Sequence, residues 1–341
     1  MRTDHVLRIG DSATEETETV DLVVTSPPYP MIEMWDEQFA AQSPAVAAAL
    51  DDGRGDEAFE AMHALLDRVW DGVVEALRPG GIVCVNVGDA TRSIGGEFRC
   101  FPNHARVTQA LRERGLSPLP NVLWRKPTNR LTKFMGSGTL PPNAYVTLEH
   151  EYVLVFRKGA PREFPPGDQT RYESAFFWEE RNRWFSDLWE LSGAAQDRDG
   201  DGRDRAGAYP LELPLRLIRM YSTYGDRVYD PFVGTGTTTL AAMLAGRHSI
   251  GHELDPDLLS GFDHRIAGLP ARSRDRVDDR LDRHRAFVRE RDDPPTYEAI
   301  HYDLPVVTKQ ERQIRLYAVT GVDRADEDGD ERRYVVSYEP R

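Results

Sequence analysis

A short run rich in proline, "TSPPYP", follows the apolar stretch Leu22–Val24 near the start of the chain. Proline fixes φ and removes a backbone donor, so Ser26-Pro27-Pro28-Tyr29 is predicted to form a stiff, extended bend at the end of a strand. We call these four residues the SPPY loop. It would hold a hydroxyl, backbone carbonyls and an aromatic ring in fixed positions, and such oxygens can orient an amine for reaction.

A second segment, "VYDPFVGTGTTTLAA" (Val228–Ala242), is typical of a strand that ends in an acid and continues through a glycine turn into a helix. We call the turn, residues 231–237, the glycine loop. Gly234 and Gly236 allow a tight turn and close approach of a ligand to the backbone. The hydroxyls of Thr237 and Thr238 are predicted to cap the helix that follows.

The acids around this loop indicate which ligand it binds. Glu253 lies 23 residues after Asp230, where a nucleotide-binding βαβ unit places the acid that binds ribose hydroxyls. The dinucleotide fingerprint is not met, because Thr239 occupies its third glycine position, and no P-loop lysine follows. Asp230-Pro231-Phe232 is also unlike a pyrophosphate cradle, since a carboxylate repels phosphates. An amine-bearing ligand with an adenosine, S-adenosylmethionine, fits better.

The two motifs resemble those of the S-adenosylmethionine-dependent DNA amino-methyltransferases. The SPPY loop resembles their catalytic motif, and "DPFVGTGTT" with the later "GHELD" resembles their cofactor motif. Because the catalytic motif comes first, the chain resembles the circularly permuted β-class of these enzymes. Further matches are "GDS" (10–12), "LRPGGIVCVNVGDA" (77–90), "VLWRKP" (122–127) and "LEHEYVLVFRKG" (148–159).

The resemblance implies roles for both motifs. Ser26 and Pro27 would supply acceptors for the target amine, and Tyr29 a face on which an extruded base stacks, because a base inside a duplex cannot be reached. Asp11 would bind the cofactor's adenine, with a simple turn acid as the alternative. The predicted catalytic residues are Ser26, Pro27, Pro28 and Tyr29. The predicted cofactor-binding residues are Asp11, Asp230, Pro231, Phe232, Gly234, Gly236, Thr237, Thr238 and Glu253.

The residue type at position 26 indicates the methyl acceptor. Family members with Ser here mostly methylate cytosine N4, and those with Asp or Asn mostly methylate adenine N6. We therefore predict cytosine N4, with adenine N6 as the alternative. Cytosine C5 methylation is excluded, because it needs a cysteine nucleophile that its family presents after proline. Here Cys84 follows Val83 and Cys100 follows Arg99.

The net charge is −14, so any basic surface that binds DNA must be local. Of the 43 basic residues, 4 are lysine and the other 39 are arginine. Many acids with almost no lysine resemble the proteomes of salt-in halophiles, and an ordinary acidic enzyme of a mesophile is the alternative. Taken with this composition, the chain is similar to the haloarchaeal CTAG-modifying cytosine-N4 methylases.

Two segments are candidates for contact with DNA. The densest basic run is "WRKPTNRLTKFMGSG" (124–138), and the resemblance places target recognition in residues 162–205. The candidate DNA-contact residues are Arg125, Lys126, Arg130, Lys133, Arg181 and Arg183. The second segment also contains aromatic residues, which fit a small apolar core better than a DNA contact. They are Phe176, Phe177, Trp178, Trp184 and Trp189.

The alternation of strand and helix patterns over residues 5–255 predicts an α/β fold. We expect a doubly wound, mostly parallel, Rossmann-like methyltransferase sheet, circularly permuted, with a target-recognition insertion and a small C-terminal β appendage. The expected parts are a catalytic part (1–158), the variable insertion (159–208), a cofactor-binding part (209–270) and a charged helix with a C-terminal hairpin (271–341).

Several classes of protein are disfavoured. No run approaches the about 18 apolar residues of a membrane span, and no signal peptide is seen, so we predict a cytoplasmic protein. The two cysteines have no metal-ligand spacing, and no metal is expected. A Rossmann-type oxidoreductase and a non-catalytic DNA-binding protein are disfavoured by the two motifs. We expect double-stranded DNA as the partner, but RNA or protein as the methyl acceptor is not excluded. It also stays open whether a partner restriction endonuclease exists and whether the protein is a monomer or a homodimer.

Overall fold

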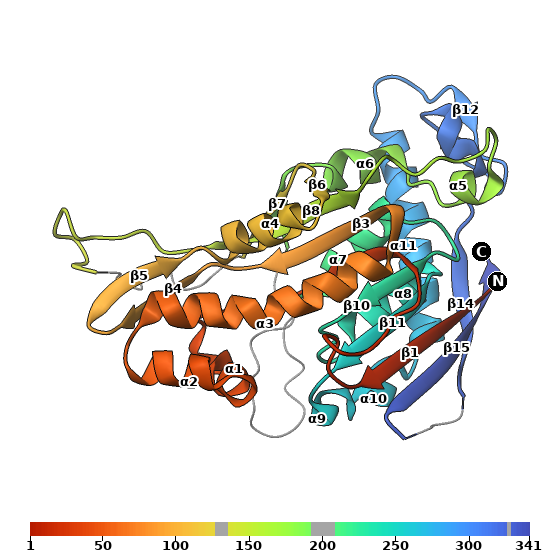
Figure 1. Ribbon diagram of the computed structural model, residues 1–341. Coiled ribbons are helices and arrows are strands. Elements are labelled where there is room, and N and C mark those ends of the chain that lie inside the picture. Colours follow the sequence, from red (N-terminus) through yellow and green to blue (C-terminus); the bar gives the residue numbers. More distant parts are fainter. Residues whose placement is uncertain (127–135, 192–208, 326–328) are drawn as a thin grey trace.

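The structure is a computed structural model that describes residues 1–126, 136–191, 209–325 and 329–341 (Figure 1). Its strands are β1 Arg2–Ile9, β2 Val20–Thr25, β3 Leu77–Val87, β4 Ala90–Ile94, β5 Glu97–Phe101, β6 Leu116–Pro118, β7 Val122–Arg125, β8 His150–Lys158, β9 Leu188–Glu190, β10 Arg227–Asp230, β11 His248–Glu253, β12 Tyr297–Glu298, β13 Pro305–Val306, β14 Tyr317–Arg324 and β15 Glu331–Pro340.

The helices alternate with these strands over most of the chain, as the sequence predicts. They are α1 Asp36–Gln42, α2 Pro44–Asp51, α3 Gly55–Ala76, α4 Asn103–Glu113, α5 Gln169–Glu173, α6 Trp178–Trp184, α7 Glu212–Tyr221, α8 Thr237–Ala245, α9 Pro256–Leu259, α10 Phe262–Ile266 and α11 Leu269–Arg289, with 3₁₀ turns at Glu33–Trp35 (η1) and Lys309–Gln313 (η2). No helix among the described residues is long and apolar enough to cross a membrane.

One large sheet organises the molecule. Its strand order is β14-β15-β1-β11-β10-β2-β3-β8-β7-β9, with β6 beside β8. The five central strands, from β1 to β3 in this order, run parallel, and antiparallel strands flank them on both sides. The predicted doubly wound α/β fold is confirmed. Short apolar strands such as β2 are typical of a parallel sheet that is covered on both faces.

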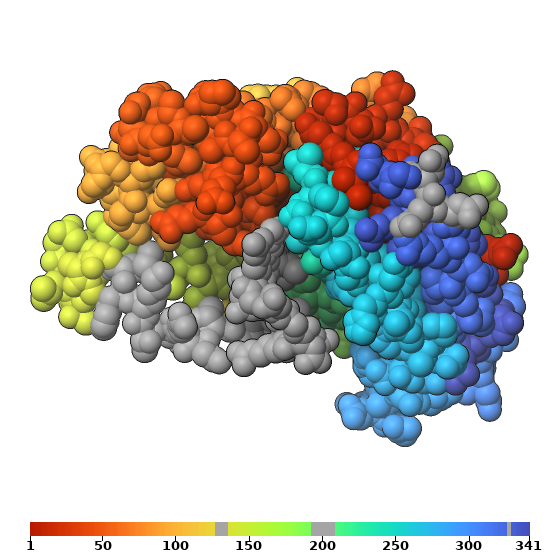
Figure 2. Space-filling model, turned by 90° about the horizontal axis from the view of Figure 1, so that it is seen from below, coloured from red at the N-terminus to blue at the C-terminus, as the bar shows by residue number. Residues whose placement is uncertain are grey.

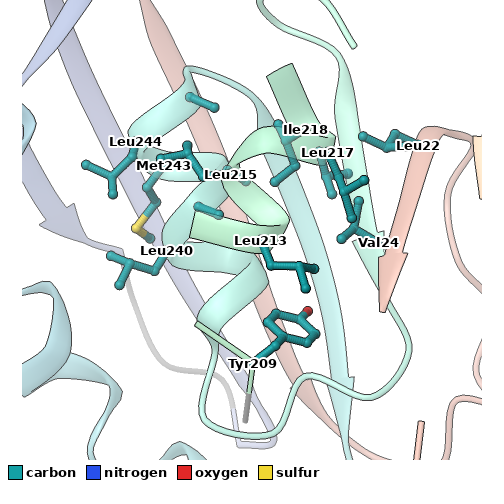
Figure 3. Close-up of a cluster of buried hydrophobic side chains, with 14 of the residues drawn as sticks. Leu22, Val24, Tyr209, Leu213, Leu215, Leu217, Ile218, Leu240, Met243 and Leu244 are labelled. Carbon is teal, nitrogen blue, oxygen red and sulfur yellow. The ribbon is translucent and has the colours of Figure 1, made fainter. Parts of the chain in front are cut away.

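Helices cover both faces of the sheet. Leu22 and Val24 of β2 point into a core made with α7 and α8, whereas Val23 points into a second core made with α3 and α4. Figure 3 shows part of the first core, where Leu217 and Ile218 of α7 lie beside Val24. Strand alternation therefore sends successive side chains of β2 into opposite layers.

The C-terminal hairpin β14–β15 is joined to the main sheet. The sequence predicts such a hairpin as a small appendage, and the structure shows β15 paired antiparallel with β1 along seven residues of β1, from Arg2 to Arg8. An exposed edge of β1 would present unpaired backbone groups, and β15 satisfies them. In Figure 2, α1 to α3 (orange) form one side of the visible face, and the C-terminal part (cyan to blue) forms the other.

A third, smaller core joins the described part of the insertion to the C-terminal segment. Phe177 of the insertion packs with Val277 and Leu281 of α11 and with Leu316 and Ala318 near β14. The charged helix α11 is therefore solvated on one side only, while its other side carries buried residues. The predicted apolar role of the insertion's aromatics is confirmed for three of them, because Phe177, Trp184 and Trp189 are buried.

Candidate functional site

The SPPY loop and the glycine loop lie at the same edge of the sheet because their strands are parallel neighbours. Leu22 and Val23 of β2 are in register with Val228 and Tyr229 of β10. The chain leaves β2 toward the layer of α3 and leaves β10 toward the layer of α8. Open α/β sheets bind ligands at the carboxyl ends of two strands whose connections diverge in this way.

Asp230 connects the two loops through hydrogen bonds. Its Oδ1 accepts from Thr25 Oγ1 at 2.6 Å and from the Phe232 N–H at 3.1 Å, and its Oδ2 accepts from Thr238 Oγ1 at 2.6 Å. Thr25 directly precedes Ser26. Thr238 also contacts the hydroxyl of Tyr209. The carboxylate thus fixes the end of β2, the glycine loop and the start of α8 relative to one another.

The environment of Asp230 disfavours its ionised form. The residue is 2% exposed, and burial raises the pKa of Asp230 to about 6, against the hydrogen bonds from Thr238 and Thr25, which lower it. A buried carboxylate gains from a cation placed beside it. The Asp230 carboxylate already accepts three hydrogen bonds from this chain. Because a carboxylate has about four lone-pair positions, the amine of a ligand could donate to the remaining one.

The two glycines of the glycine loop adopt backbone conformations that other residues avoid. Gly234 has φ +56° and Gly236 has φ +85°. A Cβ on Gly236 would lie 2.4 Å from the ring of Phe262, whereas a Cβ on Gly234 would meet nothing within 4 Å. Gly236 is therefore required by close packing in this chain, and Gly234 leaves open space beside the loop.

The predicted capping of α8 by threonine hydroxyls is wrong. Gly236 is the N-cap, and it has no side chain that could accept a hydrogen bond. Thr238 instead bonds Asp230, and Thr237 Oγ1 accepts from Arg265 Nη2 at 3.1 Å. A threonine two residues after the N-cap points toward the strand β10 and finds the buried carboxylate, which is the stronger acceptor.

Glu253 and Asp11 lie next to the glycine loop at the ends of β11 and β1. Glu253 Oε2 accepts from the Gly234 N–H at 2.7 Å, and burial raises the pKa of Glu253. The Gly10 N–H donates to the Glu253 carbonyl at 2.9 Å, which places Asp11 at the same edge. Asp11 bonds the Ala13 N–H at 2.9 Å, which is the geometry of a turn acid.

The residues around this loop fit an adenosine and an amine. Open space lies beside Gly234, and Glu253 keeps lone pairs free for hydroxyls after its bonds to the backbone. The ring of Phe232, a residue of the glycine loop, lies edge to face against Trp70 with centroids 5.9 Å apart. A buried acid and a second acid as acceptors, with an aromatic ring as an apolar surface, suit S-adenosylmethionine.

The hydroxyls of the SPPY loop belong to a network that the sequence reasoning did not assign. Tyr29 OH lies 3.0 Å from Ser26 Oγ, 3.0 Å from Glu151 Oε2 and 2.8 Å from Asn86 Nδ2. Asn86 Nδ2 also donates to Glu151 Oε2 at 2.6 Å, and Lys126 Nζ pairs with Glu151 Oε1. Burial and the negative charge of Glu151 raise the pKa of Tyr29 well above 10.

Asn86 could have been found from the sequence pattern, whereas the place of Glu151 depends on strand pairing. Asn86 interrupts the apolar run "IVCVNV", and a polar residue in a buried strand is expected to have a partner. Glu151 is a charged residue that precedes the apolar part of "HEYVLVF" at the start of β8. Because β8 is antiparallel to β3, its first residues reach the edge where β3 ends. That pairing was not readable from the sequence.

The backbone of the SPPY loop is held from behind by Asn103. Its amide donates to the carbonyls of Pro30 and Gly88, both at 3.0 Å, and its oxygen bonds His63 Nε2 at 3.0 Å. Met31, just after the loop, has φ +67°, an uncommon value for a residue with a side chain. Gly88 lies against the Tyr29 ring, where a Cβ would be 3.1 Å from it. These contacts hold the backbone of the loop in place from several sides.

The candidate DNA-contact residues have different surroundings. Arg130 and Lys133 lie outside the described residues. Lys126 contacts Glu151 in the network above, and Arg125 lies near Glu149 and Glu190 at 3.5 and 3.4 Å. On α6, the Arg181 guanidinium lies 5.7 Å from the ring centre of Phe185.

Arg183, also on α6, has a different electrostatic setting. It forms no ion pair with another residue that the structure describes. Burial and the nearby Arg216 and Arg283 lower the pKa of Arg183. Glu180 and Glu212 act in the opposite direction. Among the candidates that the structure describes, an arginine close to other arginines and without an ion pair is favourable for an external anion.

A cluster of acids around His284 resembles a metal site but has an internal cation. Glu179, His284 and Glu311 place possible ligand atoms within 4.8 Å of one another. His284 Nδ1 donates to Glu179 Oε2 at 3.0 Å, and Nε2 donates to the Pro305 carbonyl at 2.9 Å. Both nitrogens therefore carry hydrogens toward acceptors, and the imidazolium compensates the acids.

Comparison with known protein families identifies the same part of the chain. Residues 20–262 match the model of the family N6_N4_Mtase, described as DNA methylase. The Type II methyltransferase M.MthZI of Methanothermobacter thermautotrophicus is 47% identical over 325 residues, covering 93% of this chain and 91% of the relative. M.MjaI of Methanocaldococcus jannaschii, also a Type II methyltransferase, is 47% identical over 280 residues, covering 78% and 92%.

Solved structures show the same architecture. TTHA0409 of Thermus thermophilus, described as a putative DNA modification methylase and crystallised with S-adenosyl-L-methionine, superposes with a TM-score of 0.59 at 31% identity, covering 77% of this chain and 93% of that chain. The cytosine-N4-specific PvuII DNA methyltransferase superposes with a TM-score of 0.51 at 19% identity, covering 77% and 86%, which is a likeness of fold.

Proposed function

The chain belongs to the N6/N4 DNA methylase family, and on that premise we propose that it methylates the N4 amine of cytosine in double-stranded DNA. S-adenosylmethionine is the methyl donor of the family. The observation that carries the proposal is the contact of Thr25 with Asp230, because it places the SPPY loop beside the glycine loop. A methyl donor at one loop and an amine at the other would then be neighbours.

The SPPY loop supplies what an exocyclic amine needs. The amine lone pair is conjugated into the base, so the nitrogen becomes nucleophilic only when acceptors orient its hydrogens and favour a pyramidal geometry. Ser26 Oγ and the Pro27 carbonyl are proposed as these acceptors, and the Tyr29 ring as the stacking face for the extruded base. The bonds of Asn103 to the Pro30 and Gly88 carbonyls keep this arrangement rigid.

The glycine loop and its acids would hold the donor. Asp230 is proposed to bind its amine, Glu253 its ribose hydroxyls and Phe232 its adenine, with Gly234 and Gly236 allowing close approach. The bound donor supplies an electrophilic methyl group on sulfur. Asp11, Pro231, Thr237 and Thr238 are proposed to shape this site, and in this chain Thr238 does so through its bond to Asp230.

Cytosine N4 is proposed over adenine N6 because Ser26 is a hydroxyl-bearing residue. In the family, cytosine N4 enzymes mostly have Ser at this position, and adenine N6 enzymes mostly have Asp or Asn. Through the resemblance of its motifs and composition, CTAG is the first recognition sequence to test. Because the chain is acidic with few lysines, the assay should span low and high salt.

The decisive experiment identifies the modified base. Duplexes with and without CTAG are incubated with the protein and labelled S-adenosylmethionine at several salt concentrations, digested to nucleosides and analysed by mass spectrometry. N4-methylcytosine confined to the CTAG duplex is the expected result. N6-methyladenine would replace the cytosine proposal by the adenine alternative, and no label on either base would overturn both.

A further inference from the structure

A chain of hydrogen bonds leads from Ser26 to the carboxylate of Glu151. Glu151 Oε2 can only accept, so it takes the single hydroxyl hydrogen of Tyr29 across 3.0 Å. The contact between Ser26 Oγ and Tyr29 OH at 3.0 Å then has Ser26 as its donor. This order of donors turns the lone pairs of Ser26 away from Tyr29. One of them accepts from Asn86 Nδ2 at 3.5 Å, and the other can accept an amine hydrogen.

The groups around Glu151 hold its carboxylate in place. Lys126 pairs with Oε1, and Asn86 Nδ2 donates to Oε2 at 2.6 Å. The side chain of Glu151 is 12% exposed and that of Lys126 is 38% exposed, so the pair connects the buried network to solvent. Asn86 is buried, and its Oδ1 has no hydrogen-bond partner among the described residues.

We propose that Glu151 is the terminal acceptor of the proton that methyl transfer releases, with Ser26 and Tyr29 as the relay. This inference rests on the proposed function. When the amine nitrogen gains a methyl group it also gains a positive charge, which it loses by releasing one proton. Ser26 Oγ accepts this proton as its own hydrogen passes to Tyr29, and the hydrogen of Tyr29 passes to Glu151 Oε2.

The balance of this step is complete within the chain. One N–H bond of the amine is broken and one carboxyl O–H bond is formed, and no oxidant or second substrate is consumed. Because burial and Glu151 raise the pKa of Tyr29, the two transfers through its oxygen are concerted and no tyrosinate accumulates. Glu151 afterwards returns the proton to water beside Lys126.

Substitution of Glu151 separates proton acceptance from structural support. Glu151→Gln keeps an oxygen that accepts from Tyr29 but removes the basic carboxylate. We expect its single-turnover rate of methyl transfer to fall at least about 10-fold, with the affinity for S-adenosylmethionine unchanged. The rate should be partly restored in Glu151→Asp, which keeps a basic carboxylate.

Controls distinguish the possible failures. Glu113→Gln removes an exposed acid of α4, bonded to Gln109, and should leave the rate unchanged. A Glu151→Gln protein with the wild-type rate would overturn the proton role. The proton role would also be overturned if Glu151→Gln and Glu151→Asp lost the same amount of cofactor affinity and the same amount of thermal stability. Glu151 would then act only as structural support. Failure of the proposed function would differ, because the wild type itself would then methylate no DNA base.

Discussion

Thr25 Oγ1 donates a hydrogen bond of 2.6 Å to Asp230 Oδ1 across 205 residues of sequence. Thr25 precedes the SPPY loop directly, and Asp230 begins the turn into the glycine loop. The two motifs that carry the resemblance to DNA methylases are thus joined by a buried hydrogen bond, in addition to the pairing of their strands. Since the bond satisfies a carboxylate that is 2% exposed, it also links the stability of the fold to the geometry of the site.

Asp230→Asn is expected to stabilise the protein while weakening cofactor binding. The pKa of Asp230 in the folded state, about 6, lies above its ordinary 3.8. Stability from this group is therefore fully present below pH 3.8 and is lost as pH rises through 6, by up to about 3 kcal/mol. Urea unfolding of Asp230→Asn should show a gain in free energy that is larger at pH 8 than at pH 5, with weaker binding of S-adenosylmethionine in calorimetry.

The matched control for Asp230→Asn is Asp279→Asn, which removes an acid on the exposed side of α11 that lies 3.6 Å from Arg283. It should change neither cofactor affinity nor the pH dependence of stability. A gain of the same size at pH 5 and pH 8 for Asp230→Asn would contradict the view that ionisation of this buried carboxylate costs stability.

Tyr29→Phe and Tyr29→Ala should separate the ring of Tyr29 from its hydroxyl. Tyr29→Ala removes the stacking face and is expected to abolish methyl transfer while leaving cofactor binding nearly intact. Tyr29→Phe keeps the ring but breaks the bonds to Ser26 and Glu151, and we expect a loss of about 10- to 100-fold in single-turnover rate. Loss of cofactor binding in either variant would show that the division of roles between the two loops is incorrect.

Gly236→Ala is expected to damage the glycine loop beyond the strain of its backbone. Gly236 and Gly115 have φ values of +85° and +84°, so alanine costs each about 1–2 kcal/mol of conformational strain. Only Gly236→Ala also places a Cβ 2.4 Å from Phe262. Thermal unfolding should show a larger loss for Gly236→Ala than for Gly115→Ala, and titration with S-adenosylmethionine should show weaker binding for Gly236→Ala alone. Similar losses in both proteins would argue against the steric explanation.

The imidazolium of His284 should make stability depend on pH. Burial lowers the pKa of His284, but hydrogen bonds to Glu179 and the Pro305 carbonyl, and the charges of Glu179 and Glu311, raise it above 6.5 overall. The stability that His284 contributes is therefore full below pH 6.5 and is lost as pH rises through the higher folded pKa. Urea unfolding between pH 5.5 and 8.5 should show this loss in the wild type and not in His284→Gln. A parallel decline in both proteins would contradict the assignment.

The local chemistry of the two loops was readable from the sequence by itself. Proline restricts φ wherever it stands, so the SPPY loop had to be a stiff bend after the apolar residues of β2. Glycines with an acid on either side likewise indicate a ligand loop, and the spacing from Asp230 to Glu253 depends only on the length of one βαβ unit. The α/β fold was predictable from the spacing of apolar residues, because this spacing is a property of residues that are close along the chain.

Only the tertiary structure decided which distant groups meet. Thr238 bonds a buried carboxylate instead of capping α8, because the packing of α8 on β10 brings the two together. Glu151 enters the site because β8 runs antiparallel to β3, so its first residues reach the edge where the parallel strands end. Strand direction and order are set by long-range pairing, which leaves no local signal in the sequence. The stiff bend at Ser26 was therefore predictable, but its hydrogen-bonded path to Glu151 was not.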